Sequence, residues 1–262
     1  MSRPPTRTVA RLSIAPVKSL ALQHPARVRL DSFGVVEDRR FYLAEAEDGR
    51  LVSGGKDGSL MRISASYDPT REWLSLSFPD GVTVGGDAMA LGEPIVTSFY
   101  GRPVPGRTVM ASFAEALSAY VGRPVQLVRP DRPGDANDER AVSLLASASA
   151  EELERQAGRT APLDSRRFRM LVELAGCRPH EEDTWEGRKL RIGQAVVEVG
   201  GPIPRCVVTT LDPDSGVKDF DTLKAIVAYR GVTPDRDINF GVYADVVEPG
   251  SIGAGDPVEI ID

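Results

Sequence analysis

The chain has 262 residues, of which 41% are hydrophobic and 27% charged, which is the composition of a folded protein with one large or two small domains. Its formal net charge of −6 argues against a nucleic-acid-binding surface. The sequence also lacks an apolar run of the ~20 residues that a membrane-spanning helix needs. We therefore expect a complete, cytoplasmic protein with no nucleic-acid and no membrane partner.

Short strands separated by turns are predicted along most of the chain, which contains 25 Gly and 20 Pro. The first strand begins at Thr8. One hairpin is predicted around Asp48-Gly49, between strands at 41–44 and 50–52, and a second around Asp80-Gly81, between 73–78 and 82–84. Further strands are predicted at 125–128, 171–174, 189–192, 195–199, 207–210 and 258–261.

Helix start and stop signals occur at only three places. Capping boxes open helices at Ser112 and Ser149, which end at Gly122 and Gly158, and Asp221 caps a helix over 222–230. A polar, turn-rich loop is predicted at 129–138, near the active face. Many strands and few helices favour a β-rich α+β fold containing a β-barrel over a βαβ repeat.

The chain has few soft metal ligands. Cys177 and Cys206 are its only cysteines, and His24 and His180 are its only histidines. The common iron–sulfur clusters need four thiolates, and a structural zinc site usually needs three or four Cys or His ligands. The sequence also lacks a Gly-x-Gly-x-x-Gly nucleotide loop. Any redox chemistry would therefore take its electrons from another protein.

Cys206 lies in a segment with the chemistry of a reactive thiol. Residues 200–204 are rich in Gly and Pro, Arg205 precedes the cysteine, and a β-branched run follows it. A neighbouring guanidinium favours the thiolate, and a rigid loop fixes the direction of the sulfur. The alternative is a buried free cysteine that acts as a small hydrophobic residue. We expect that alternative for Cys177.

Three other segments place cations or hydroxyls beside turns. In 16–20, Lys18 and Ser19 follow a strand and could hold a phosphate. In 34–41, Asp38 could orient Arg39. In 164–169, three arginines occur within four positions and could bind anionic oxygens. Taken singly, each segment is better explained by a solvated surface or a weak ion pair.

Together these segments resemble the MOSC family, and within it the members with an N-terminal MOSC β-barrel domain, such as the mitochondrial amidoxime-reducing component. The resemblance implies an N-terminal barrel-like domain over residues 1–110 and a C-terminal MOSC β-barrel domain with a few short helices over 111–262. The motifs that carry it are 16–19, Asp38-Arg39, the helix at Ser149, 167–169, Glu182-Asp183-x-Trp185, Arg205-Cys206, 240–243 and Gly250-x-Ile252-x-x-Gly255-Asp256.

The same resemblance implies a pyranopterin molybdenum cofactor between the two domains. Cys206 would be the protein ligand to molybdenum and a catalytic residue. Asp138, in the polar loop, would be an acid near the metal. The family positions that hold the cofactor correspond here to Lys18, Ser19, Arg39 and Arg169. We also count Arg167 and Arg205 among the cofactor-binding residues, as anion clamps.

The implied activity is that of a molybdenum-cofactor-dependent oxidoreductase, which reduces N-hydroxylated or N-oxygenated small molecules. The implied partners are the small-molecule substrate and an external electron donor, either ferredoxin-like or a flavin reductase. An alternative uses the same binding residues: a carrier of the cofactor, or of sulfur on Cys206, without substrate turnover. The sequence leaves both open.

Overall fold

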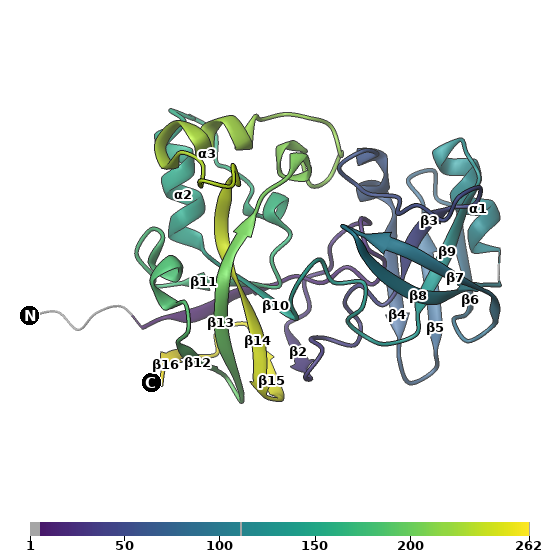
Figure 1. Cartoon of the computed structure of the whole chain (residues 1–262), viewed down its shortest axis with the longest axis horizontal. Helices are drawn as coiled ribbons and strands as arrows, with labels where there is room; N and C mark the ends of the chain where they lie inside the picture. The colour runs from purple at the N-terminus through teal and green to yellow at the C-terminus, as the bar shows by residue number, and fades with distance from the viewer. Residues whose placement is uncertain (1–5, 111, 262) are drawn as a thin grey trace, which may run out of the picture.

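The computed structural model describes residues 6–110 and 112–261, which form two lobes that lie side by side (Figure 1). Both lobes are built mainly from strands, so the predicted β-rich α+β class is confirmed. Within the described residues, the helices are α1 (Phe113–Val121), α2 (Ser147–Gln156) and α3 (Thr222–Arg230), together with the 3-10 helices η1 (Gly58–Arg62), η2 (Ser165–Phe168), η3 (Glu181–Trp185) and η4 (Val207–Thr210).

The larger lobe contains a seven-stranded sheet that nearly closes into a barrel. Its first and last strands meet where Thr8 bridges Pro257, and the amide of Val258 donates to the carbonyl oxygen of Arg7 over 2.9 Å. A two-stranded sheet of β2 (Arg27–Leu30) and β15 (Gly250–Gly253) packs against it. In spatial order the seven strands are β1 (Thr8–Leu12), β11 (Val172–Ala175), β10 (Val142–Ala146), β14 (Asn239–Glu248), β13 (Ala195–Pro204), β12 (Lys189–Ile192) and β16 (Val258–Ile260).

The smaller lobe combines two antiparallel sheets with α1. Alternating apolar residues of its strands, such as Leu74 and Leu76, point into a core that Phe113 and Leu117 of α1 complete. Its sheets contain, in spatial order, β3 (Tyr42–Glu45), β9 (Val125–Pro130), β8 (Arg102–Val109) and β7 (Leu91–Phe99), and then β4 (Ser64–Asp68), β5 (Trp73–Ser77) and β6 (Thr83–Asp87).

The chain enters the larger lobe first, leaves it, and returns. Strand β1 pairs with β11, and in Figure 1 this purple strand crosses the lobe built from the C-terminal half. Helix α1 and strand β9 belong to the core of the smaller lobe. The division at 110/111 remains a prediction. From the packing we propose that the lobes separate after Pro130, with β1 and β2 assigned to the larger one.

The predicted helices form, but one begins differently. Helix α3 has the predicted bounds, and the Asp221 carboxylate accepts from the amide of Lys224 over 3.2 Å. Helix α2 begins at Ser147, so Ser149 is not its cap. The buried Ser149 hydroxyl instead donates to Glu182 (2.7 and 2.9 Å), and the Glu182 side chain also accepts from the amide of Ala146, just before the helix, over 3.3 Å.

Most predicted strands are confirmed, and two are not. The hairpin around Asp80-Gly81 forms between β5 and β6. After Asp48-Gly49, however, only Leu51 makes a bridge, with Ala44, so 50–52 is not a strand. The second exception is 207–210, described below with the site. No helix in the described ranges is long and apolar enough to cross a membrane.

The two lobes touch through bare backbone at Gly58 and Gly216. A Cβ on Gly58 would overlap the carbonyl oxygen of Gly216. We therefore expect Gly58→Ala to force the lobes apart and lower the melting temperature by roughly 3–10 °C, because overpacking costs about 1–3 kcal/mol. Gly201→Ala is the matched control in thermal unfolding, since its Cβ would meet only the Glu186 carboxylate, at 3.9 Å. Equal melting temperatures for the two variants would contradict this contact.

The buried Glu182 carboxyl makes stability depend on pH. Burial raises the pKa of Glu182 to about 7, from its usual 4.5, against the opposing hydrogen bond from Ser149. The folded state therefore favours the protonated form, and this contribution is full below pH 4.5 and is lost as the pH rises through 7. Relative to Glu182→Gln, the wild type should lose stability on the order of 2–3 kcal/mol across that window. Urea unfolding at pH 4.5, 6 and 8 measures the difference, and parallel pH profiles would refute it.

Candidate functional site

Four basic side chains from separate loops meet between the lobes. Lys18 follows β1, Arg39 precedes β3, Arg169 follows η2, and Arg205 follows β13. The Arg39 guanidinium donates to the carbonyl oxygen of Arg169 over 3.3 Å, and its charge acts on both Lys18 and Arg169. We call these four residues the cation cluster. Its members come from all four segments that the sequence marked as candidate sites.

Lys18 is held inside the site by three contacts. The residue is 7% exposed, and its ammonium donates to the carbonyl oxygen of Ala136 (2.9 Å) and to the Asp138 carboxylate (2.7 Å). The same ammonium lies 5.4 Å from the centre of the Phe99 ring. Burial lowers the pKa of Lys18, and the nearby Arg39 charge acts in the same direction, whereas Asp138 opposes them. The Asp138 carboxylate therefore offsets only part of the cost of burying this ammonium group beside Arg39.

Asp138 reaches this site from the loop between β9 and β10, which begins after Pro130 rather than at Arg129. Although burial opposes ionisation, Lys18 and Arg39 lower the pKa of Asp138 to about 2. At neutral pH the side chain is consequently a carboxylate that accepts hydrogen bonds. In this arrangement Asp138 balances and orients Lys18 rather than donating a proton.

The backbone is left-handed at three of the predicted cofactor-binding residues. Ser19, Arg39 and Arg169 have φ values of 75°, 47° and 52°. Positive φ is uncommon outside glycine, and residues held there against their preference cluster at functional sites. These three turns direct the surrounding loops towards the space between the lobes.

Arg39 and Arg169 place two guanidinium groups near each other. Arg39 pairs with Asp38, and Arg169 donates to the carbonyl oxygen of Leu20 over 2.6 Å. Burial, and then the charge of Arg39, lower the pKa of Arg169 to about 10. Like charges this close raise the free energy of the site unless an anion offsets them.

Arg205 fixes the loop that carries the thiol. Its guanidinium donates to the carbonyl oxygens of Phe240 (2.7 Å) and Phe168 (3.1 Å) and lies 5.5 Å from the centre of the Phe168 ring. Burial lowers the pKa of Arg205 to about 10, while the charges of Tyr243 and of the Cys206 sulfur oppose that change. Arg205 therefore interacts electrostatically with the Cys206 sulfur, while its hydrogen bonds go to two backbone carbonyl oxygens and to the Met170 sulfur (2.8 Å).

Cys206 is exposed and stands between a strand and a tight turn. Its backbone is extended, and η4 follows directly, so the strand predicted over 207–210 is wrong. The hydroxyls of Thr209 and Thr210 donate back to the carbonyl oxygens of Cys206 (3.1 Å) and Val207 (2.7 Å). These local bonds turn a β-branched run into a 3-10 helix.

Ser19 lies beside Lys18 and is 9% exposed. Gly54 packs against it so closely that a Cβ on Gly54 would lie 3.3 Å from the Ser19 Cβ. Within residues 6–110 and 112–261, the Ser19 hydroxyl has no hydrogen-bond partner. The hydroxyl is thus available to a ligand.

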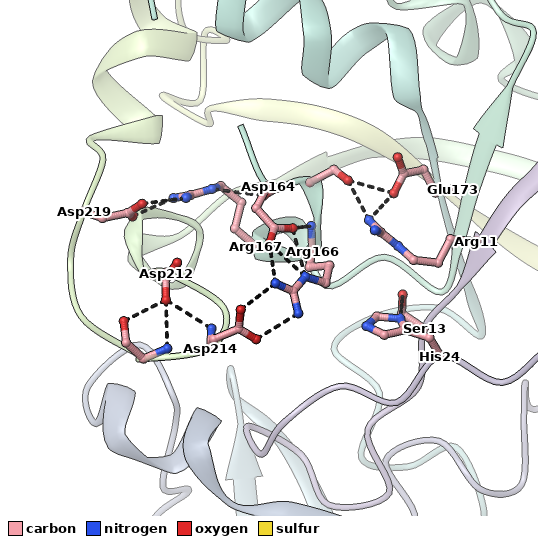
Figure 2. A network of polar contacts seen from close by, with 12 residues as sticks. Arg11, Ser13, His24, Asp164, Arg166, Arg167, Glu173, Asp212, Asp214 and Asp219 are labelled. Atoms are coloured by element: carbon pink, nitrogen blue, oxygen red, sulfur yellow. Dashed lines mark hydrogen bonds and ion pairs between the residues drawn. The ribbon is translucent and has the colours of Figure 1, made fainter. Parts of the chain in front are cut away.

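Arg167 is not brought into the cation cluster. It is 3% exposed, and its guanidinium pairs with both oxygens of Asp219 (3.0 and 2.9 Å) and donates to the carbonyl oxygen of Thr209 (3.2 Å). Figure 2 shows this pair, with Arg166 beside it bridging two further aspartates. Arg167 therefore braces η4 and the loop that follows Cys206.

Two tyrosines at the site were not among the predicted residues. The Tyr100 hydroxyl donates to Asp138 over 3.3 Å. Burial, and then the Asp138 charge, raise the pKa of Tyr243 to about 12, whereas the charges of Arg205 and Arg39 lower it. Tyr243 belongs to the 240–243 motif, one of those that carry the family resemblance. For Tyr100 the only signal was a tyrosine before Gly101, in a position typical of a hairpin turn.

Two domain models match the chain. The MOSC N-terminal beta barrel domain matches residues 6–123, and the MOSC domain matches residues 131–259. The chain therefore belongs to the MOSC family. More narrowly, it is a member in which an N-terminal beta barrel domain precedes the MOSC domain, as the resemblance predicted.

Several relatives align with almost the whole chain. Mitochondrial amidoxime reducing component 2 of Bos taurus is 27% identical, covering 96% of this chain and 82% of the bovine protein. Mitochondrial amidoxime-reducing component 1 of Homo sapiens is 25% identical, covering 97% and 83% respectively. Among solved structures, the YUAD protein from Bacillus subtilis covers 97% of this chain and 96% of its own at 13% identity, with a TM-score of 0.43.

Proposed function

We propose that this protein holds a pyranopterin molybdenum cofactor between its lobes and reduces N-hydroxylated small molecules. One observation carries the proposal: an exposed cysteine, Cys206, adjoins a partly buried cluster of four cations that only two carboxylates offset. The names of the bovine and human relatives support reduction of an amidoxime. Those relatives are named as mitochondrial, and the cytoplasmic location of this chain stays a prediction.

The charges of the site fit an anionic cofactor. The four cations of the cluster face the carboxylates of Asp38 and Asp138, which leaves an excess of two positive charges. A phosphate monoester carries about −1.5 to −2 at neutral pH and would offset that excess. Lys18, Ser19, Arg39 and Arg169 would hold this end of the cofactor.

The single sulfur also fits a metal that brings its own ligands. In the described ranges, no three His, Cys, Asp or Glu side chains gather where they could hold a metal ion. A soft thiolate from Cys206 suits molybdenum, provided that the cofactor supplies the remaining sulfurs. The exposed position of Cys206 leaves room for a substrate at the metal.

The reaction breaks the N–O bond of the substrate, forms an N–H bond and releases the oxygen as water. It takes up two protons and two electrons, and the electrons come from a separate ferredoxin-like or flavin reductase. When bound, the cofactor supplies the two-electron chemistry. The protein orients the site: Arg205 fixes the Cys206 loop, Arg167 braces the turn after it, and Asp138 holds Lys18.

The cation cluster should determine cofactor retention. We expect Lys18→Ala, Arg39→Ala and Arg169→Ala each to weaken cofactor binding by roughly tenfold to a hundredfold, because a charge-assisted hydrogen bond contributes about 1.5–3 kcal/mol. Molybdenum per protein after dialysis measures this. Arg132→Ala is the control, since Arg132 is an exposed cation in the loop that carries Asp138. Full molybdenum in all three cluster variants would refute the assignment.

The two cysteines should behave differently. Burial, and then Glu181 and Glu182, raise the pKa of Cys177 to about 12, so it stays a thiol. We expect Cys206→Ser to abolish reduction of benzamidoxime and to change the absorption spectrum of the metal, and Cys177→Ser to preserve both. The assay uses protein from a host that makes the cofactor, with reduced viologen as donor.

The same assay separates the enzyme from a carrier. NADH without an added reductase should give no turnover. Wild-type protein that binds molybdenum but reduces no N-hydroxylated compound would favour the carrier of cofactor or sulfur. Loss of turnover in Cys177→Ser with full turnover in Cys206→Ser would overturn the ligand assignment.

A further inference from the structure

Tyr100 occupies a position where the fold does not favour an aromatic residue. Strands β7 and β8 form a hairpin in which Phe99 pairs with Arg102, so Tyr100 and Gly101 are its two-residue loop. Their φ values are 52° and 91°. Loops of this kind favour Asn-Gly, Asp-Gly or Gly-Gly, and positive φ is disfavoured for a bulky side chain. The aromatic ring therefore does not stabilise the backbone conformation of this turn, and we look for its role in the surroundings of the turn.

The hairpin tip is fixed beside the cation cluster. Tyr100 is 75% exposed, yet its hydroxyl donates to Asp138, the partner of Lys18. Arg102 donates to the carbonyl oxygens of Asp135 (2.9 Å) and Asn137 (3.0 Å) in the same loop. One end of the ring is therefore anchored at the site while most of its surface faces solvent.

The exposed thiol and the Tyr100 hydroxyl interact electrostatically. Burial of the hydroxyl, and then the charges of Asp138 and of the Cys206 sulfur, raise the pKa of Tyr100. Val207, next to the thiol, is 45% exposed and packs on Gly55 of the smaller lobe. Val207 thus gives the cysteine an exposed apolar neighbour on the larger lobe, and the Tyr100 ring is an exposed aromatic surface of the smaller lobe beside the polar cation cluster.

We propose that Tyr100 is a specificity-determining residue whose ring forms a wall of the substrate entrance and favours flat aromatic N-hydroxylated substrates over small aliphatic ones. The inference rests on the function proposed above and names the substrate class. An aromatic substrate would stack on the exposed face of the ring, whereas a methyl group offers too little surface for that contact. The hydroxyl bond to Asp138 holds the ring in place.

Replacing Tyr100 with asparagine tests this directly, because Asn-Gly is a favoured sequence for the turn and the variant should melt no lower than the wild type. With benzamidoxime, Tyr100→Asn should raise KM roughly three- to tenfold, the range that aromatic contacts represent. With acetamidoxime the change should stay within about twofold. Tyr100→Phe keeps the ring but loses the hydrogen bond that holds it, so its ratio of kcat/KM for the two substrates should lie between those of the wild type and Tyr100→Asn.

Val96→Thr is the matched control, since Val96 lies on β7 of the same hairpin and is 64% exposed. Equilibrium dialysis of benzamidoxime against cofactor-loaded protein gives a readout that does not depend on turnover, and only Tyr100→Asn should bind it more weakly. If the wild type reduces both amidoximes and Tyr100→Asn leaves their ratio unchanged, the inference is wrong and the proposed function stands. If the wild type reduces neither compound, both fail.

Discussion

The arrangement of the site depends on keeping four cations close together in the space between two lobes. Removing charge from water is costly, and like charges in proximity add to that cost. Two carboxylates, Asp38 and Asp138, offset part of it. Backbone carbonyl oxygens offset more of this cost by accepting hydrogen bonds. The carbonyl oxygen of Ala136 accepts from Lys18, and those of Phe168 and Phe240 accept from Arg205. The residual positive charge is what an anionic ligand would neutralise.

Such a site requires the lobes to keep a defined relative position. The backbone contact between Gly58 and Gly216 fixes how closely they approach. On the larger lobe, Arg166 bridges Asp164 and Asp214, so the loop that bears Gly216 is itself held (Figure 2). The loop after Cys206 therefore serves two purposes, since it shapes the surroundings of the thiol and seats the smaller lobe.

Neighbouring arginines in the sequence have unlike roles in the fold. Arg167 and Arg169 are two positions apart, yet one pairs with Asp219 beneath η4 and the other joins the cation cluster. The tight 3-10 turn of η2, followed by a left-handed residue at Arg169, separates their directions. A run of arginines indicates that anions are bound nearby, but the backbone conformation determines which guanidinium group is available. Family resemblance alone treated both as clamps.

The sequence by itself determined the β-rich class, the family, the helix over 222–230 and the candidate status of Lys18, Arg39, Arg169 and Cys206, because local patterns and motif order suffice for these. Only the tertiary structure decided the rest. It placed β1 in the larger lobe, where this strand pairs with β11. It also made 207–210 a 3-10 helix, in which threonine hydroxyls donate back to backbone carbonyl oxygens. In the folded chain Lys18 and Arg39 lower the pKa of Asp138, and the Tyr100 hydroxyl reaches the same carboxylate. Each of these outcomes depends on contacts between residues far apart in the chain or on backbone geometry, which residue spacing does not encode.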